Sequence, residues 1–310
     1  MNIRRFIAYL LCLSLLLTAF TLVSCDDTIA DETTEVSTEK ATEVTTEAET
    51  SAPVGDVVEY SVKISSEGKF LLDEVEFEVY ADRECTSLRA RGETNSKGEG
   101  KFKLPETTYY LKLKSAPDGY QYEELYEITN TSTSITLKSY IRDNAPASNF
   151  RYQTGDVIHN FILSGEGEGA ITVADALEQY NCIVLNFWYI GCGPCKAEFP
   201  YIQSAYEKYS DKVGFFALNG NPAESNQDIA NFMSQNGYTF KTGRADNAII
   251  NYFGIVGFPT TIIIDKYGVI CLMETGSVPE EAPFVNAFAH FTSDSYSETT
   301  IFDSLHDIGT

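Results

Sequence analysis

The sequence is short of basic residues. It contains 22 Lys and Arg against 45 Asp and Glu, which gives a formal net charge of −23 at pH 7. A chain this acidic does not attract nucleic acid, and anionic lipid headgroups repel it. We therefore expect no nucleic-acid partner, and any attachment to a membrane has to be covalent.

The sequence also lacks a recognisable set of metal ligands. Its three histidines, His159, His290 and His306, are scattered, and none stands beside a cysteine pair. No second Cys-x-x-Cys pair accompanies Cys192 and Cys195, which disfavours a zinc site. We expect no metal and no cofactor.

Residues 25–54 are nearly free of large apolar side chains. They are rich in Thr, Glu and Ala, so they cannot bury a core and are expected to be disordered. Repulsion between like charges keeps such a segment extended. The composition therefore predicts a tether.

Residues 1–24 have the pattern of a targeting segment. Arg4 and Arg5 precede an apolar run, and Leu22-Val-Ser-Cys25 resembles a bacterial lipobox. The resemblance implies a lipoprotein signal peptide over residues 1–24 and a lipid on Cys25. The alternatives are an uncleaved transmembrane anchor, since the run is near the lower length limit for a span, and plain secretion. All three place the rest of the chain outside the cytoplasm.

The stretch Cys192-Gly-Pro-Cys195 carries the clearest chemistry. An apolar run over residues 183–188 predicts a strand, and a helix is expected to begin at the cysteine pair. At a rise of ~1.5 Å per residue, the two Cα atoms lie about 4.5–5.5 Å apart, which suits a disulfide. The helix N-terminus stabilises a thiolate. The pattern predicts thiol–disulfide exchange, with Cys192 as the exposed nucleophile and Cys195 as the buried resolving thiol; the alternatives are half a zinc site and a structural disulfide.

Further motifs carry a resemblance to a known family. Asn186-Phe-Trp precedes the cysteines, Lys196-Ala-Glu198-Phe-Pro follows them, and Phe258-Pro259-Thr-Thr precedes a second apolar run. Together they resemble the TlpA/ResA branch of the thioredoxin superfamily. The resemblance implies an α/β thioredoxin fold, a cis peptide bond before Pro259, and a Phe258 backbone that binds substrate. The family usually has Trp before the first Cys, where this chain has Gly191.

The same resemblance gives Glu198 a role. It matches a glutamate that tunes the buried thiol in ResA-like proteins, and the alternative is a solvated helix carboxylate. Thioredoxins proper carry a buried Asp where this chain has Asn186. Glu198 is therefore the best substitute for that proton acceptor.

Residues 55–142 have the alternation of an all-β domain. Short runs of alternating polarity are separated by turn signals about every ten residues, which predicts a small β-sandwich; the runs cover residues 58–64, 75–80, 101–104, 109–113 and 134–137. The segment Gly92 to Tyr120 resembles the Cna-B/SpaA-type, prealbumin-like domains of Gram-positive surface proteins. Those domains often use a Glu to promote a Lys–Asn isopeptide bond. Leu113 stands at that position, so we expect no cross-link.

The remaining segments complete the expected organisation. Residues 143–154 form a polar hinge, residues 155–292 a thioredoxin-like domain, and residues 293–310 a loose or docked tail. In the thioredoxin-like domain we expect helices over 172–180, 194–209, 224–235 and 279–290, and strands over 183–188, 213–218, 260–265 and 269–274. Cys182 and Cys271 are expected to be buried free thiols on strands that are not neighbours.

These features predict a lipid-anchored thiol–disulfide oxidoreductase on the extracytoplasmic face of the cell membrane. The Gly-Pro insert resembles reducing thioredoxins, so a disulfide reductase is favoured. Its partners would be a protein disulfide substrate and a membrane thiol-reducing donor protein. The alternatives are a surface adhesion or scaffold protein with an accessory redox domain, and a thiol peroxidase. The sequence does not identify the substrate or the donor.

Overall fold

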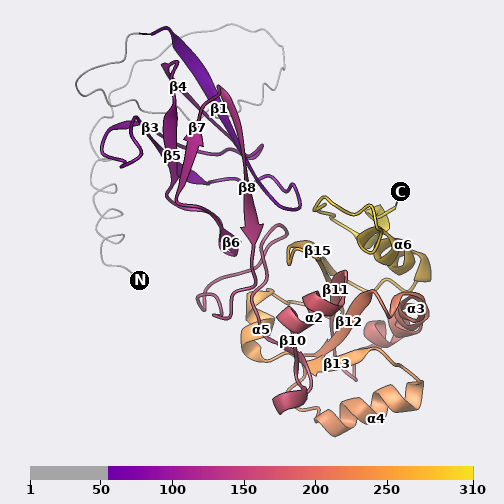
Figure 1. The fold of residues 1–310 in the computed structure, drawn as a ribbon. Helices are drawn as coiled ribbons and strands as arrows, with labels where there is room; N and C mark the ends of the chain where they lie inside the picture. Colours follow the sequence, from indigo (N-terminus) through magenta and orange to yellow (C-terminus); the bar gives the residue numbers. More distant parts are fainter. Residues whose placement is uncertain (1–54, 310) are drawn as a thin grey trace, which may run out of the picture. The chain divides into compact units, whose positions relative to one another are not determined.

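The computed structural model describes residues 55–309, which all belong to one compact unit. The expected signal peptide, the lipidated Cys25 and the tether lie outside the described residues. Figure 1 shows an all-β region, followed along the chain by a mixed sheet flanked by helices.

The first region is a β-sandwich, as the alternation predicted. One sheet has the order β4-β1-β8-β6 and the other β3-β2-β5-β7. The first contains β4 (Glu99–Pro105), β1 (Val57–Ser66), β8 (Ser132–Ser139) and β6 (Tyr120–Gln121), and the second β3 (Leu88–Glu93), β2 (Glu76–Tyr80), β5 (Tyr109–Leu113) and β7 (Leu125–Ile128). Buried aromatic rings from both sheets form the core: Tyr60, Phe77, Phe102 and Tyr109. Leu113 is buried in the same core.

Three strands of the sandwich were not expected. Strand β3 has the sequence Leu-Arg-Ala-Arg-Gly-Glu, in which only Ala90 is fully buried. Strands β6 and β7 have two and four residues. Runs this polar or this short carry little alternation of their own, and cross-strand pairing stabilises them instead.

The second region is the mixed sheet expected of a thioredoxin fold. Its order is β13-β12-β11-β14-β15. The strands are β13 (Lys241–Arg244), β12 (Val213–Asn219), β11 (Cys182–Trp188), β14 (Thr260–Asp265) and β15 (Ile270–Thr275). Strands β11, β12 and β13 are parallel; β14 pairs antiparallel with β11, and β15 pairs antiparallel with β14.

Helices cover both faces of this sheet (Figure 1). They are α2 (Val173–Gln179), α3 (Gly193–Tyr209), α4 (Asn226–Asn236), α5 (Asn247–Tyr252) and α6 (Glu281–Phe291). Side chains alternate along β11, so Val184 and Trp188 pack with α3, α4 and α6, while Leu185 and Phe187 pack with α2 and α5. Burial on both faces explains why β11 is an unbroken apolar run apart from Asn186.

The structure adds elements that the sequence did not predict. These are β13, α5, and a short ladder of β9 (Ile162–Ser164) with β10 (Ile171–Thr172), together with two 3-10 turns, Gly167–Gly169 and Leu305–Asp307. Helix α4 begins at Asn226 rather than at residue 224, because Ser225 caps it and forms a capping box with Asp228.

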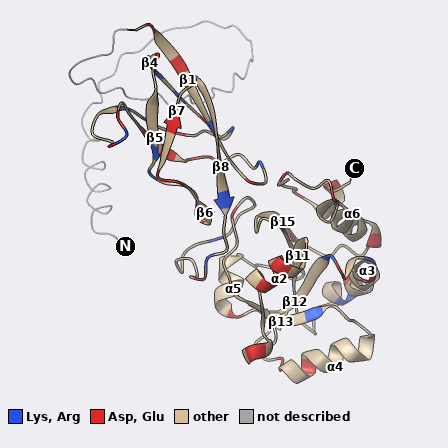
Figure 2. Ribbon diagram, in the orientation of Figure 1, with Lys and Arg blue, Asp and Glu red and all other residues tan. Residues whose placement is uncertain are grey.

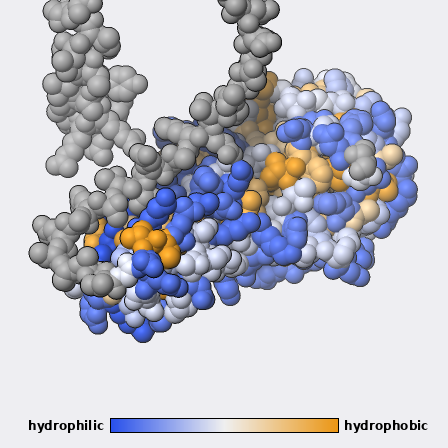
Figure 3. Space-filling view, turned by 90° about the horizontal axis from the view of Figure 1, so that it is seen from above, coloured by the Kyte–Doolittle hydropathy of each residue, from blue (hydrophilic) through white to orange (hydrophobic). Residues whose placement is uncertain are grey.

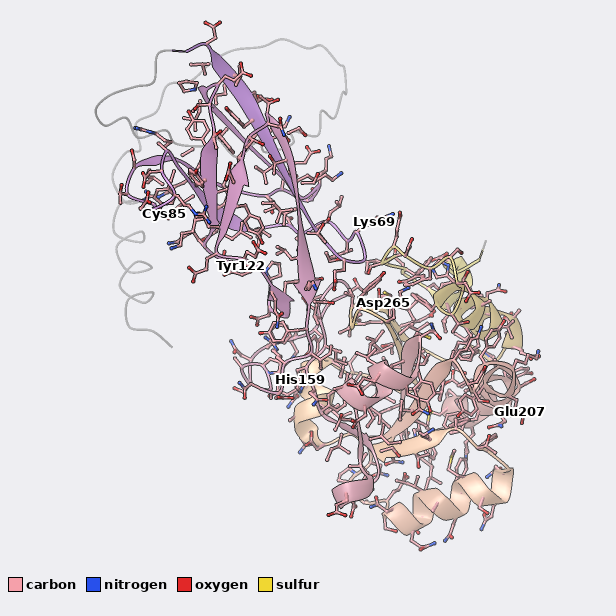
Figure 4. The ribbon with its side chains drawn as sticks, viewed as in Figure 1. Lys69, Cys85, Tyr122, His159, Glu207 and Asp265 are labelled. Carbon is pink, nitrogen blue, oxygen red and sulfur yellow. A yellow bond between two sulfur atoms is a disulfide. The ribbon has the colours of Figure 1, made fainter. Side chains whose placement is uncertain are left out.

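The residues that follow α6 are docked rather than loose. The Asp265 carboxylate, at the end of β14 (Figure 4), accepts hydrogen bonds from the Tyr296 hydroxyl at 2.9 Å and the Thr299 hydroxyl at 2.7 Å. The backbone N–H groups of Tyr267 and Val269 also donate to it. Four donors compensate a carboxylate that is fully buried.

The sandwich and the second region share apolar contacts. Val157 and Val269 form a β-bridge with each other and lie in the same hydrophobic cluster as the sandwich core. The backbone N–H of Thr299 donates to the Gly68 carbonyl at 2.6 Å, and Lys69 pairs with Glu298. The expected domain limits are not tested by these contacts and stay predictions.

The three remaining described cysteines are free. Cys182 and Cys271 are buried, as expected, and β14 separates their strands; Cys85 is partly exposed. Burial raises the pKa of both buried thiols, which makes them poor nucleophiles.

The surface reflects the acidic composition. Asp and Glu are distributed over both regions and outnumber Lys and Arg (Figure 2). Hydrophilic residues cover most of the face seen in Figure 3, with hydrophobic residues confined to a few patches. Within the described part of the chain, no helix combines the length and apolarity needed to cross a bilayer.

Candidate active site

Cys192 and Cys195 lie where β11 passes into α3. Strand β11 ends at Trp188, and a tight turn closes when the Cys192 N–H donates to the Tyr189 carbonyl at 3.0 Å. Cys192 is the N-cap of α3, with Pro194 in its first turn. The Cα atoms are 5.3 Å apart and the two sulfur atoms form a disulfide. The predicted spacing is confirmed.

The start of α3 favours negative charge on the first cysteine. The Cys195 N–H donates to Cys192 Sγ at 3.1 Å. A helix of 17 residues adds its dipole at the same end. Both effects stabilise a thiolate at Cys192 once the disulfide is reduced.

The expected exposure of Cys192 is wrong for this oxidised state. Cys192 is 3% exposed and Cys195 is fully buried. Partly buried neighbours pack against the Cys192 cluster, including Tyr189, Ile190 and Phe258. The order of exposure is as predicted, but the difference between the two cysteines is small.

The loop before β14 faces the disulfide. The Phe258–Pro259 peptide bond is cis, as expected. The Phe258 carbonyl oxygen lies 3.7 Å from Cys192 Sγ, so the residue singled out for substrate binding is brought next to the sulfur. Pro259 itself is buried.

Glu198 is buried beneath the cysteines rather than solvated. Its side chain is fully enclosed, and its carboxylate accepts the Val278 N–H at 3.0 Å and the Asn186 Nδ2–H at 2.9 Å. Burial raises the pKa of Glu198 to about 7, although these two hydrogen bonds act to lower the pKa. The alternative of a solvated helix carboxylate is therefore wrong.

Asn186 connects Glu198 to the start of β14. Besides Glu198, its Nδ2 donates to the Thr261 hydroxyl at 3.1 Å. Its Oδ1 is buried without a hydrogen-bond partner among the described residues. The residue in place of the thioredoxin Asp is thus a direct neighbour of the carboxylate expected to substitute for it.

Glu224 is a site residue that the sequence reasoning missed. Both of its carboxylate oxygens accept a hydrogen bond from the Ile190 N–H, at 2.9 and 3.1 Å. They also accept hydrogen bonds from the side-chain amides of Asn219 and Asn221. This carboxylate holds the turn that precedes Cys192. The sequence predicts a helix that begins at residue 224, which places Glu224 inside the helix, whereas the structure places it just before the Ser225 cap. No sequence signal distinguishes a helix residue from one that holds the turn.

Pockets and metal ligands do not contribute to this site. A hollow of about 890 Å³ lies between β9, β13 and the starts of α4 and α5, and its lining includes neither cysteine. In the described chain, no three His, Cys, Asp or Glu side chains are grouped as a metal site.

Sequence comparisons identify both regions. Residues 153–289 match the Redoxin family, and residues 60–145 match SpaA, a prealbumin-like fold domain. A solved structure described as a putative thiol:disulfide interchange protein DsbE from Chlorobium tepidum is 26% identical, covers 41% of this chain and 88% of that chain, and has a TM-score of 0.36.

Curated relatives share the redoxin part. Thiol-disulfide oxidoreductase ResA of Bacillus subtilis is 30% identical over 122 residues, which span 39% of this chain and 66% of the relative. ResA of Halalkalibacterium halodurans is 30% identical over 151 residues, spanning 48% of this chain and 83% of that protein. The chain therefore belongs to the ResA-type thiol-disulfide oxidoreductases, with a SpaA-type prealbumin-like domain preceding its redoxin domain.

Proposed function

We propose that this chain is a membrane-tethered, extracytoplasmic disulfide reductase that acts through Cys192 and Cys195. In the net reaction, the dithiol of the reduced enzyme and a client disulfide become an enzyme disulfide and a client dithiol. Two electrons and two protons pass to the client. A thiol-reducing donor protein in the membrane then returns the enzyme to the dithiol form.

The reaction proceeds in two exchanges. The Cys192 thiolate attacks one client sulfur, and the other client sulfur leaves as a thiolate and takes up a proton. Cys195 then loses its proton and attacks Cys192 Sγ in the mixed disulfide, which releases the second client thiol. Glu198, three residues after Cys195 on α3, is the proton acceptor for the second exchange.

One observation carries this proposal. The cysteine pair occupies the start of α3 directly opposite the Phe258 carbonyl, which lies 3.7 Å from Cys192 Sγ. A client strand can pair with this backbone while its disulfide is presented to Cys192. A purely structural disulfide needs neither a facing backbone acceptor nor a buried carboxylate with a pKa near neutrality.

The direction toward reduction follows from the dipeptide between the cysteines. Gly193-Pro194 is similar to the insert of reducing thioredoxins. Thioredoxin has a reduction potential of about −270 mV and the oxidant DsbA about −120 mV. We expect a potential nearer the first value.

Reduction of insulin disulfides by the protein, with dithiothreitol as the electron source, tests the activity. Cys192→Ser should abolish catalysed reduction without unfolding the protein, because no thiolate remains at the helix start. Cys195→Ser should accumulate a mixed disulfide with the client, visible by mass spectrometry. Cys85→Ser, which removes a free cysteine of the sandwich, is the matched control and should retain full activity. Retained activity in Cys192→Ser would refute the assignment of the nucleophile.

The membrane tether is tested separately. If Cys25 carries the lipid, Cys25→Ala should leave an uncleaved precursor or release the protein from the membrane fraction. Cell fractionation with immunoblotting measures both. Unchanged processing and membrane retention would favour a plain anchor.

A further inference from the structure

The turn before Cys192 carries an aromatic side chain that the reaction itself does not use. The Tyr189 ring packs edge-on against the Phe258 ring, with the centroids 5.4 Å apart and an interplanar angle of 85°. Both rings are partly buried and belong to the cluster that surrounds Cys192. Tyr189 therefore forms part of the rim over which a client disulfide must approach.

Glycines make room for this pair of rings on both sides. A Cβ at Gly191 would lie 3.0 Å from Tyr189 Cε2, and one at Gly220 would lie 2.8 Å from Phe258 Cζ. Gly191 is exposed and lies outside the left-handed backbone region, so its backbone angles do not require glycine. What glycine supplies at position 191 is the space that the Tyr189 ring occupies.

The two chain segments that carry the pair contain no charged residue of their own. They are residues 189–194 and 255–261, in a chain with a net charge of −23. The Glu224 carboxylate that reaches the first segment accepts hydrogen bonds from the Ile190 N–H and from the side chains of Asn219 and Asn221. Val256, at the edge of the second segment, is 93% exposed. The Tyr189 hydroxyl makes no hydrogen bond within the described residues, and it is not among their buried unpaired groups. The rim around Cys192 therefore presents the aromatic ring of Tyr189, and no charged side chain of its own segments, to a bound client.

We propose that Tyr189, seated by Gly191 against Phe258, is a specificity-determining residue that favours client disulfides flanked by an apolar side chain. The inference rests on the proposed function, because it concerns the client of the same reaction. The client side chain beside the attacked cysteine packs on the Tyr189 ring while the client backbone lies along Phe258. Contact with an apolar residue removes its surface from water, whereas a small polar residue gains little. The acidic field of the chain disfavours clients with flanking carboxylates.

Two disulfide-linked peptides that differ only in the residue beside the cysteine, Leu or Ser, provide the test. For the unaltered enzyme we expect kcat/KM for the Leu peptide to exceed that for the Ser peptide by about tenfold, the scale on which one apolar contact discriminates. Tyr189→Ala should reduce this ratio to within about twofold, chiefly by raising KM for the Leu peptide. Tyr189→Phe should retain it, since the ring rather than the hydroxyl makes the contact.

Gly191→Val tests whether the space at position 191 is needed to hold the Tyr189 ring against Phe258. Its branched side chain displaces Tyr189 from Phe258 and should lower the ratio like Tyr189→Ala, and the double variant should lower it no further. Tyr140→Ala, which removes an exposed tyrosine beyond the end of β8, is the matched control and should leave the ratio unchanged.

The outcomes separate the two proposals. If the enzyme reduces both peptides but shows no preference, or if Tyr189→Ala keeps the preference, the inference is wrong and the reductase function stands. If the enzyme reduces neither peptide, the proposed function fails and the inference fails with it.

Discussion

The charge state of Glu198 is expected to affect both stability and turnover. It is fully buried, and burial raises the pKa of its carboxyl to about 7 from an ordinary value near 4.5. Between these two pH values the folded protein binds a proton that the unfolded chain has lost. The contribution of Glu198 to stability is therefore complete below about pH 4.5 and is lost as pH rises through about 7.

Glu198→Gln should remove this dependence. The unfolding free energy of the variant should lack the decrease between pH 4.5 and 7 that Glu198 causes in the unaltered protein, as measured by urea denaturation at several pH values. The glutamine amide cannot accept both the Asn186 and Val278 hydrogen bonds, so the substitution also changes stability at every pH. The slope of the unfolding free energy against pH is therefore the informative quantity, and not its absolute value. Equal slopes in the two proteins would show that folding does not raise the pKa of Glu198.

The same variant should slow the second exchange more than the first. A neutral amide cannot accept the Cys195 proton, so the mixed disulfide should decay at least several-fold more slowly near neutral pH. Stopped-flow measurements with a peptide disulfide separate attack from resolution. Unchanged decay across pH 6 to 9 would limit Glu198 to a structural role.

At the scale of elements, the site depends on the turn between β11 and α3. The turn contains Tyr189 and leads into Cys192, and its Ile190 N–H donates to Glu224 from the segment between β12 and α4. This cross-connection ties the turn before α3 to the segment that follows β12. The reactive sulfur is therefore positioned by three chain segments and not by its helix alone.

Glu224→Ala should loosen this turn. Removal of the carboxylate leaves the Ile190 N–H without its acceptor and also frees Asn219 and Asn221. We expect the midpoint of thermal unfolding to fall by several degrees, for a loss of about 1–3 kcal/mol, and kcat/KM for insulin reduction to fall several-fold. Glu207→Ala, in the outer part of α3, provides a comparison because the side-chain hydrogen bond of Glu207 within the described residues is to Gln203 on the same helix. Equal effects of the two substitutions would contradict a positioning role for Glu224.

At the scale of the whole molecule, the segment after α6 closes the redoxin region and meets the sandwich. Tyr296 and Thr299 donate to the buried Asp265, and the Thr299 backbone bonds to Gly68 of the sandwich. Asp265 lies at the end of β14 away from Pro259, which precedes the start of that strand. The hydrogen bonds of the tail to Asp265 therefore lie at the end of β14 opposite to the loop that faces the disulfide.

Tyr296→Phe should destabilise the protein without impairing its chemistry. The change removes one hydrogen bond to a buried carboxylate, so the unfolding free energy should fall by about 1.5–3 kcal/mol. Insulin reduction at 25 °C should stay within about twofold of the unaltered enzyme. Chemical denaturation and the activity assay measure the two quantities. A large loss of activity in a folded variant would mean that the tail communicates with the site.

Much of the redoxin region was determined by the sequence alone. The apolar run 183–188 and the cysteine pair each specify a local conformation. The strand and the helix start follow from a few adjacent residues, so they could be predicted together with the Cα spacing of the cysteines. The cis peptide bond before Pro259 was expected only from the resemblance to the TlpA/ResA branch, because most X-Pro bonds are trans. The sandwich followed in the same way from strands with strict alternation.

Contacts between distant segments were decided only by the tertiary structure. The carboxylates of Glu198 and Glu224 have the same local chemistry, yet one is buried against Asn186 and Val278 and the other clamps a turn. The exposure of Cys192 depends on a loop more than sixty residues away, and the seat of Tyr189 depends on Phe258 in that loop. Burial, pKa and rim shape arise from which segments pack together, because solvent exclusion is a property of the assembled fold and not of a local sequence pattern.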